Sequence, residues 1–335
     1  MMAALAVSCS KEPTDSGGSG NGAKTSLSFT YPRPAVNATT GVDPVTRATV
    51  PASELEKAVY DLSVFAFGED GTFVGELTAA GGDYTEILRH ETQTIELSRA
   101  FLSEHYGRTL TFYFVANNVA SKGGPHATAA DLASMTATEF GNSLCAELPV
   151  SNGKSDPLED LRFYNYHANG IYEGLLMTAH TEPVLLTGRK AEQITLTRRT
   201  ARFDVRNDFK DTHELSEIYV TQAPVNGLLF GSGRQTVPPA LRDYRMMYGP
   251  WGDEYDAANE YSGWFYLYPC TLGRGATEIE LLVTRLADNA TAYARLKGTT
   301  TIDANKRYTL VFNAVDMTFT LEGGKGDDYN EGNTP

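Results

Sequence analysis

The stretch that decides the fold reads Leu62-Ser63-Val64-Phe65-Ala66-Phe67, then Gly68-Glu69-Asp70-Gly71, then Thr72-Phe73-Val74-Gly75-Glu76-Leu77. Two short apolar runs, rich in valine and phenylalanine, are separated by a turn that ends in Asp-Gly, which is a strong local signal for a hairpin. The stretch therefore predicts an antiparallel β-hairpin at residues 62–77.

Similar strand patterns occupy much of the chain on both sides of this hairpin. Short runs with alternating or clustered apolar residues lie at 27–31, 109–118, 193–205, 218–221, 264–268, 278–284, 293–297, 308–312 and 315–321. Helical patterns are confined to residues 100–105 and 129–140. Many short strands at intervals of about 8–12 residues, with few helices, predict an all-β protein made of sandwiches or partly open barrels.

The final run breaks the pattern of the run before it. Its apolar residues take odd positions: Val315, Met317, Phe319 and Leu321. The apolar residues of the preceding run take even positions, from Tyr308 to Phe312. Because a one-residue slip reverses the faces of a strand, this change predicts a bulge or a turn at residues 313–314.

The N-terminus has the pattern of a lipid attachment signal. A short apolar run ends at Ser8-Cys9, and a polar segment rich in glycine and serine follows it. This order predicts a lipoprotein precursor that is cleaved before Cys9, acylated on that thiol and held to a membrane by lipid. One acyl chain binds weakly, at ~0.8 kcal/mol per buried CH₂, so stable attachment needs more than one chain. An unstructured N-terminus with an unmodified cysteine is the other interpretation.

The length of 335 residues favours two domains. We expect the end of a signal peptide and a tether at residues 1–23, a first β-domain at 24–185, a second at 186–322 and a polar tail at 323–335. The boundary near residue 185 follows Thr181-Glu182-Pro183, after which a second set of strands begins.

The charge, the apolar runs and the cysteines of the chain argue against some classes of function. The chain has 28 basic and 42 acidic residues and a net charge of −14, which opposes nucleic-acid binding because such proteins present a basic patch. No apolar run approaches the roughly 20 residues that a membrane-spanning helix requires. Besides Cys9, the chain has Cys145 and Cys270, which either pair in an oxidising compartment or remain buried thiols.

Motifs of catalysis and metal binding are missing from the sequence. The six histidines do not have the spacing of a zinc site, and there is no nucleophile elbow, phosphate-binding loop, dinucleotide fingerprint or Cys-x-x-Cys pair. The acidic clusters at residues 253–256 and 327–328 each supply too few oxygen ligands for calcium. We therefore expect a protein that is not an enzyme and that needs no metal or cofactor.

Aromatic residues are dense in the segment 244–261, together with glycine and methionine. This composition is typical of binding surfaces, where rigid rings supply contact area. The candidate binding residues are Tyr248, Trp251 and Tyr255. The residues of this loop could either contact a ligand or pack inside the protein. The run at 264–268 is expected to be a core strand.

In their order along the chain, these features resemble the fimbrillins, the lipoprotein-derived subunits of type V pili on Gram-negative anaerobes. The resemblance rests on Cys9 with its tether and on residues 27–31, 62–74, 115–118 and 196–203, and it spans residues 9 to about 321. It implies two transthyretin-like β-sandwich domains in tandem, export as a lipoprotein to the cell outer membrane, and a surface-exposed position in a fimbria.

The resemblance also implies how subunits join. In fimbrillins an arginine-specific protease removes the first segment, and a strand of a neighbouring subunit fills the groove that is left. The matching cleavage site here is Arg47–Ala48, in a segment with little periodicity. The candidate donor-strand residues are Val315, Met317, Phe319 and Leu321. The implied partners are other fimbrial subunits and a ligand on a host or bacterial surface.

The sequence is also compatible with a function other than that of a fimbrial subunit. The chain could be a cell-surface lipoprotein that binds a glycan or a protein without polymerising. Such a protein would use the aromatic loop around Trp251.

Overall fold

The computed structural model describes residues 27–32, 62–77, 92–116, 132–142, 176–187, 190–224, 227–230, 241–247 and 261–328. Strands account for most of these residues, and the helices are short, so the prediction of an all-β protein is confirmed. Within the described ranges, none of the helices combines the length and the apolar character needed to cross a membrane.

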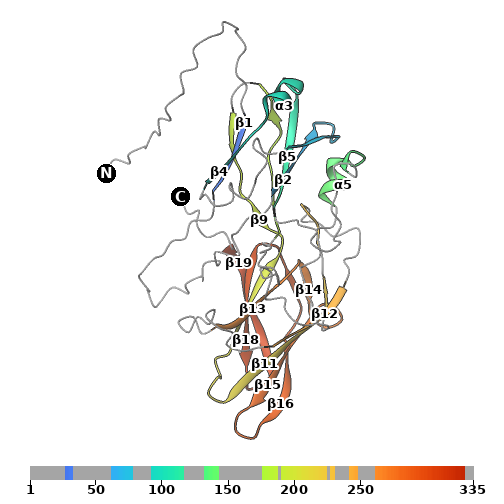
Figure 1. Ribbon diagram of the computed structural model, residues 1–335. Coiled ribbons are helices and arrows are strands. Elements are labelled where there is room, and N and C mark those ends of the chain that lie inside the picture. Colours follow the sequence, from blue (N-terminus) through green and yellow to red (C-terminus); the bar gives the residue numbers. More distant parts are fainter. Residues whose placement is uncertain are drawn as a thin grey trace, which may run out of the picture.

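The described residues of the first part of the chain form two sheets and two short helices (Figure 1). The smaller sheet has the order β4-β1-β8, with β4 at Thr92–Glu96, β1 at Leu27–Pro32 and β8 at Lys190–Gln193. The larger sheet has the order β3 (Phe73–Leu77), β2 (Leu62–Gly68), β5 (Thr109–Ala116), β6 (Met177–His180) and β9 (Thr197–Arg198), with β7 (Val184–Leu185) beside β5. The helices are α3 (Arg99–Glu104) and α5 (Ala137–Gly141).

In the second part of the chain, the described residues form one large sheet and one strand pair. The eight strands of the large sheet, in spatial order, are β12 (Leu241–Met247), β11 (His213–Pro224), β15 (Glu278–Arg285), β16 (Ala290–Leu296), β19 (Thr318–Asp328), β18 (Lys306–Asn313), β10 (Ala201–Arg206) and β13 (Tyr261–Leu267). The pair consists of β14 (Cys270–Leu272) and β17 (Thr300–Ile302). In Figure 1 these strands occupy the end of the molecule opposite to α3.

The pairing of strands changes between Arg198 and Ala201. Both β8 and β9 follow residue 185, yet β8 pairs with β1 and β9 pairs with β6. All described strands from β10 onward pair with one another instead. The division into two sandwich domains remains a prediction, and this pairing favours a boundary at residues 199–200 over the one expected near 185.

The predicted hairpin is formed by β2 and β3, which pair in antiparallel fashion. Gly71 adopts a φ of 78°, a left-handed conformation that glycine reaches without steric cost. The backbone N–H and the hydroxyl of Thr72 both donate to Asp70 Oδ1, at 3.0 and 2.7 Å. These bonds to the Thr72 hydroxyl and backbone lower the pKa of the Asp70 carboxyl. The Asp-Gly signal thus has a direct structural cause.

Strand β2 is buried on both of its faces. Val64 and Ala66 belong to an apolar cluster within the first part of the chain. Phe65 and Phe67 point to the other face and belong to a second cluster, which continues into the strands of the second part. A strand buried on both faces needs an unbroken apolar run rather than strict alternation, which explains the sequence of residues 62–67.

The two helical predictions differ in their outcome. Helix α3 lies close to its predicted range, and the Ser98 hydroxyl caps it by accepting a hydrogen bond from Phe101 N at 3.2 Å. The prediction of a helix over 129–140 is wrong for residues 133–136, which form turns and a bridge, so α5 begins only at Ala137. The reason is that Thr136 pairs with Thr72 of the hairpin and caps α5 together with Glu139.

The predicted break at residues 313–314 is confirmed as a turn. Strand β18 ends at Asn313, residues 314–317 form the turn, and β19 begins at Thr318 opposite Asn313. Strand β19 then continues to Asp328, which pairs with Lys306. The polar tail expected from residue 323 therefore starts with strand residues, because main-chain pairing does not depend on apolar side chains.

Candidate functional site

The strand that the sequence indicated as removable, β1, lies in the middle of its sheet. On one side it pairs in antiparallel fashion with β4, from Ser28 opposite Glu96 to Pro32 opposite Thr92. On the other side it pairs in parallel fashion with β8, from Leu27 opposite Lys190 to Thr30 opposite Gln193. As a central strand, β1 would leave two rows of unpaired backbone groups if it were removed, one on β4 and one on β8.

The two neighbours of β1 lead directly into the apolar core of the first part. Leu97 follows β4 and Ile194 follows β8, and they are 7% and 5% exposed. Both belong to the cluster that contains Val64 and Phe112. A slot between β4 and β8 would therefore border a packed core, and an incoming strand would meet apolar side chains as well as free main-chain groups. We call the place of β1 between β4 and β8 the β1 slot.

The expected modification sites, Cys9, Arg47 and Ala48, lie outside the described residues. Their position along the chain still matters. Arg47 and Ala48 lie between β1 and β2, so a cut there would separate β1 from every later strand. Cys9 lies on the same side of that cut as β1.

The four donor-strand candidates do not form one open strand face. Val315 is 88% exposed and lies with Met317 in the turn between β18 and β19, where Met317 has a φ of 52°. Phe319 is 0% exposed and lies opposite Phe312. Leu321 packs partly buried against the same apolar cluster. Met317 also packs partly buried against this cluster, so three of the four side chains contact the core of their own sheet.

The aromatic candidates Tyr248, Trp251 and Tyr255 also lie outside the described residues. Tyr244 begins the aromatic segment 244–261 and lies in the adjacent strand β12. It is 2% exposed and belongs to the core, so this residue packs inside the protein and is not free to contact a ligand. Tyr266, in the run that was predicted to be a core strand, is buried as expected.

Of the two cysteines that could pair, Cys145 is outside the described residues and Cys270 is a free thiol. Burial is the main cause that raises the pKa of the Cys270 thiol to about 11. A thiol with this pKa is almost fully protonated near neutral pH, so it is a poor nucleophile.

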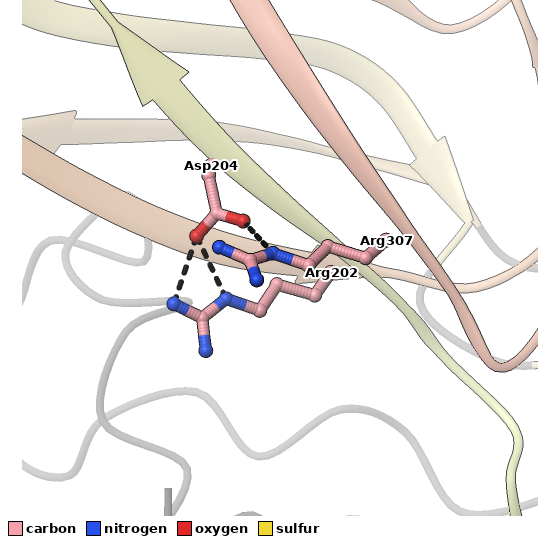
Figure 2. Close-up of polar contacts among 3 residues, drawn as sticks. All are labelled: Arg202, Asp204 and Arg307. Carbon is pink, nitrogen blue, oxygen red and sulfur yellow. Dashed lines mark hydrogen bonds and ion pairs between the residues drawn. The ribbon is translucent and has the colours of Figure 1, made fainter. Parts of the chain in front are cut away.

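A buried group of three charged side chains joins β10 to β18 (Figure 2). Arg202 donates from Nε and lies with Nη2 close to the same carboxylate oxygen, Asp204 Oδ1, both at 2.8 Å. Arg307 donates from Nε to the other oxygen, Oδ2. Asp204 is 0% exposed, and the two arginines are less than a tenth exposed. The group links neighbouring strands and has the properties of a structural clamp.

Arg206, also on β10, lies 3.0 Å from Asp208, so Arg202 and Arg206 both pair with a nearby carboxylate. The role of Arg307 was missed. The Arg-x-Asp spacing on one strand face was a usable signal for the local pair, but no pattern pointed to a partner 103 positions away. Among the residues that the structure describes, no group of three or more His, Cys, Asp or Glu could hold a metal ion.

Solved structures of other proteins share this fold. The tip fimbrial protein Mfa3 from Porphyromonas gingivalis, with a C-terminal truncation, matches with a TM-score of 0.52 and 14% identity over 90% of this chain and 98% of that chain. A candidate cell adhesion protein from Parabacteroides distasonis matches with a TM-score of 0.52 and 16% identity over 91% of this chain and 90% of that one. No protein-family model and no curated protein matches the sequence. The chain has the fold of these fimbrial and adhesion proteins.

Proposed function

We propose that this chain is a structural or adhesive subunit of a cell-surface fimbria, exported as a lipoprotein and joined to other subunits by strand exchange after proteolysis. The observation that carries the proposal is the central position of β1 between β4 and β8, with the expected cleavage site on the chain between β1 and β2. The fold that it shares with a fimbrial tip protein supports the same conclusion. The role is one of assembly or adhesion rather than catalysis.

Cleavage after Arg47 would have two effects in this scheme. It would remove the covalent link between β1 and the later strands, so that another strand could replace β1 in its pairing with β4 and β8. It would also detach the remaining subunit from Cys9, and therefore from the lipid that holds the precursor to the outer membrane. The subunit would then be held by its neighbours alone. Main-chain hydrogen bonds would supply affinity, and apolar side chains next to the slot would supply specificity.

The donor strand is the second element of this scheme. The candidates Val315, Met317, Phe319 and Leu321 would have to leave the turn and the sheet in which they lie. Because Phe319 is completely buried, its departure would expose part of its own core. A donor from a different fimbrial subunit would avoid this loss and would fill the same slot.

The experiment compares cleavage of two arginine variants in the full precursor. Arg47→Ala should resist an arginine-specific protease and stay monomeric, whereas the cleaved wild type should form multimers that resist detergent. Arg33→Ala is the matched control, because Arg33 lies between Pro32 and Pro34, a poor protease site, and should behave like wild type. Cleaved wild type that stays monomeric with its partner subunits present would remove the polymerisation role.

The alternative function is a surface lipoprotein that binds a glycan or a protein without polymerising. The tyrosine, tryptophan and glycine content of the loop around Trp251 favours it. Ligand binding that is lost in Trp251→Ala, in a chain that never forms multimers, would support this alternative instead.

A further inference from the structure

A short segment of the second part of the chain lies directly against the first part. We call residues 227–230, between β11 and β12, the joint segment. Phe230 N donates to Gly141 O at 3.2 Å, at the end of α5. The hydroxyl of Thr178 on β6 donates to Leu229 O at 3.0 Å. Arg199, at the boundary between the two parts, donates from Nε to Leu228 O at 3.0 Å. Three successive residues of the joint segment are thus bound through their main chain.

The ring of Phe230 completes an aromatic cluster that belongs otherwise to the first part. Its centroid lies 4.9 Å from that of Tyr113, edge to face at 82°, and 5.5 Å from that of Phe140. Tyr113 and Phe140 in turn each lie 5.3 Å from Phe67 of the hairpin. Aromatic pairs at such distances contribute about 0.5–1.5 kcal/mol beyond their buried area in other proteins. Phe230 therefore packs with side chains from β5 and α5, which in turn contact Phe67 of β2.

The other end of the joint segment is fixed to the second part. A Cβ added to Gly227 would lie 2.9 Å from Cδ1 of Tyr268, so the backbone packs directly on that ring. Tyr268 is 2% exposed. Leu229, which is 3% exposed, belongs to the apolar cluster that runs without interruption from Phe65 to the buried strands β10 and β18.

We infer that the joint segment locks the two parts of the chain into one rigid, cooperatively unfolding body. Units that meet through small polar interfaces usually move relative to one another. Here a shared apolar core, an aromatic cluster and three main-chain contacts replace such an interface. A body of this kind would transmit a pulling force from one end to the other without bending at its middle. The inference holds whether or not the chain assembles into a fibre.

Scanning calorimetry on the full chain tests this lock. The wild type should unfold in one transition whose calorimetric and van't Hoff enthalpies agree. Phe230→Ala should split the transition into two, because the first part would lose the ring that ties it to the second. Phe209→Ala is the matched control: this half-buried ring contacts Phe312 in the second part and should lower the transition temperature without splitting the transition. Two transitions in the wild type, or one in Phe230→Ala, would overturn the inference.

Thr178→Val provides a milder test if Phe230→Ala does not fold. This substitution keeps the shape of the side chain and removes the hydroxyl that binds Leu229 O. In the wild type, the most protected amides of β5 and β18 should exchange hydrogen with the same free energy of opening. In the variant these free energies should differ. Different values in the wild type, or equal values in the variant, would contradict the lock.

Discussion

Asp204 and Arg307 join two parallel strands, β10 and β18, through an ion pair whose carboxylate is completely buried. The second carboxylate oxygen accepts from Arg202, so both oxygens of Asp204 have charged partners. Burying such charges carries a desolvation penalty, and their attraction offsets it only when the hydrogen bonds are well formed. The pair is therefore a sensitive point of the fold, since the loss of one member leaves the others buried without compensation.

We expect Asp204→Asn to lower the free energy of unfolding by about 3–5 kcal/mol, the range for removal of one member of a buried ion pair. Urea unfolding followed by intrinsic fluorescence measures the change. Asp208→Asn is the control, because Asp208 pairs with Arg206 at the surface, where such pairs contribute at most about 1 kcal/mol. Equal effects of the two substitutions would show that Asp204 has no special structural role.

A charge at Phe319 is expected to unfold the subunit rather than block assembly selectively. Phe319→Asp places a carboxylate at a side chain that is 0% exposed, which requires costly desolvation. Val315→Asp changes a side chain that is 88% exposed and should alter stability by less than about 0.5 kcal/mol. Circular dichroism melts of both variants give the comparison. A stable, folded Phe319→Asp monomer would instead mean that this part of β19 can leave its sheet.

Cys270 should be almost unreactive in the folded protein. With a pKa of about 11, only about one thousandth of the thiol is ionised at pH 8. Alkylation by iodoacetamide, followed by mass spectrometry, should be much slower in the folded chain than in urea. Rapid alkylation of Cys270 at pH 8 without denaturant would contradict the raised pKa of this thiol.

The raised pKa of the Cys270 thiol also makes the free energy of unfolding depend on pH. The pKa of this acid is higher in the folded state than the ordinary value of 9.0, so its contribution is fully present below about pH 9. It should be lost progressively as the pH rises toward about 11. Cys270→Ala should flatten the unfolding free energy in that interval relative to the wild type. An identical pH profile in both proteins would refute the assignment.

Gly227→Ala should destabilise the fold, because its Cβ would approach the Tyr268 ring to 2.9 Å. Overpacking of this kind typically costs about 1–3 kcal/mol. Gly75→Ala is the control, since the nearest atom to its Cβ is Phe101 Cε2 at an ordinary 3.9 Å. Thermal unfolding of the two variants should separate them clearly, and equal melting temperatures would argue against close packing at Gly227.

Local features of the fold could be predicted from the sequence. The hairpin at 62–77 and the turn after Asn313 follow from turn residues and from the parity of apolar positions, which act over a few residues. The burial of Phe112 follows from the same alternation. These signals were sufficient for the all-β class.

Long-range pairings could not be predicted in the same way. No pattern within residues 27–32 shows that β1 lies between β4 and β8, because its partners lie far along the chain and the choice depends on the whole core. The two-sided burial of β2 depends on α5, whose Phe140 packs against Phe65 and Phe67 from a distant part of the chain. The start of α5 was misplaced for a similar reason, since its cap, Thr136, is held by Thr72 of the hairpin.

The mixed neighbours of β1 have a consequence for the symmetry of any fibre built through its slot. β4 is antiparallel to β1 and β8 is parallel to it. The hydrogen-bond pattern of the slot therefore fits a strand in only one of its two possible directions. A strand that keeps this pattern has to enter with its N-terminus and C-terminus placed as those of β1 were. Each added subunit would then take the same orientation as the one before it. The fibre would be polar, with two chemically different ends.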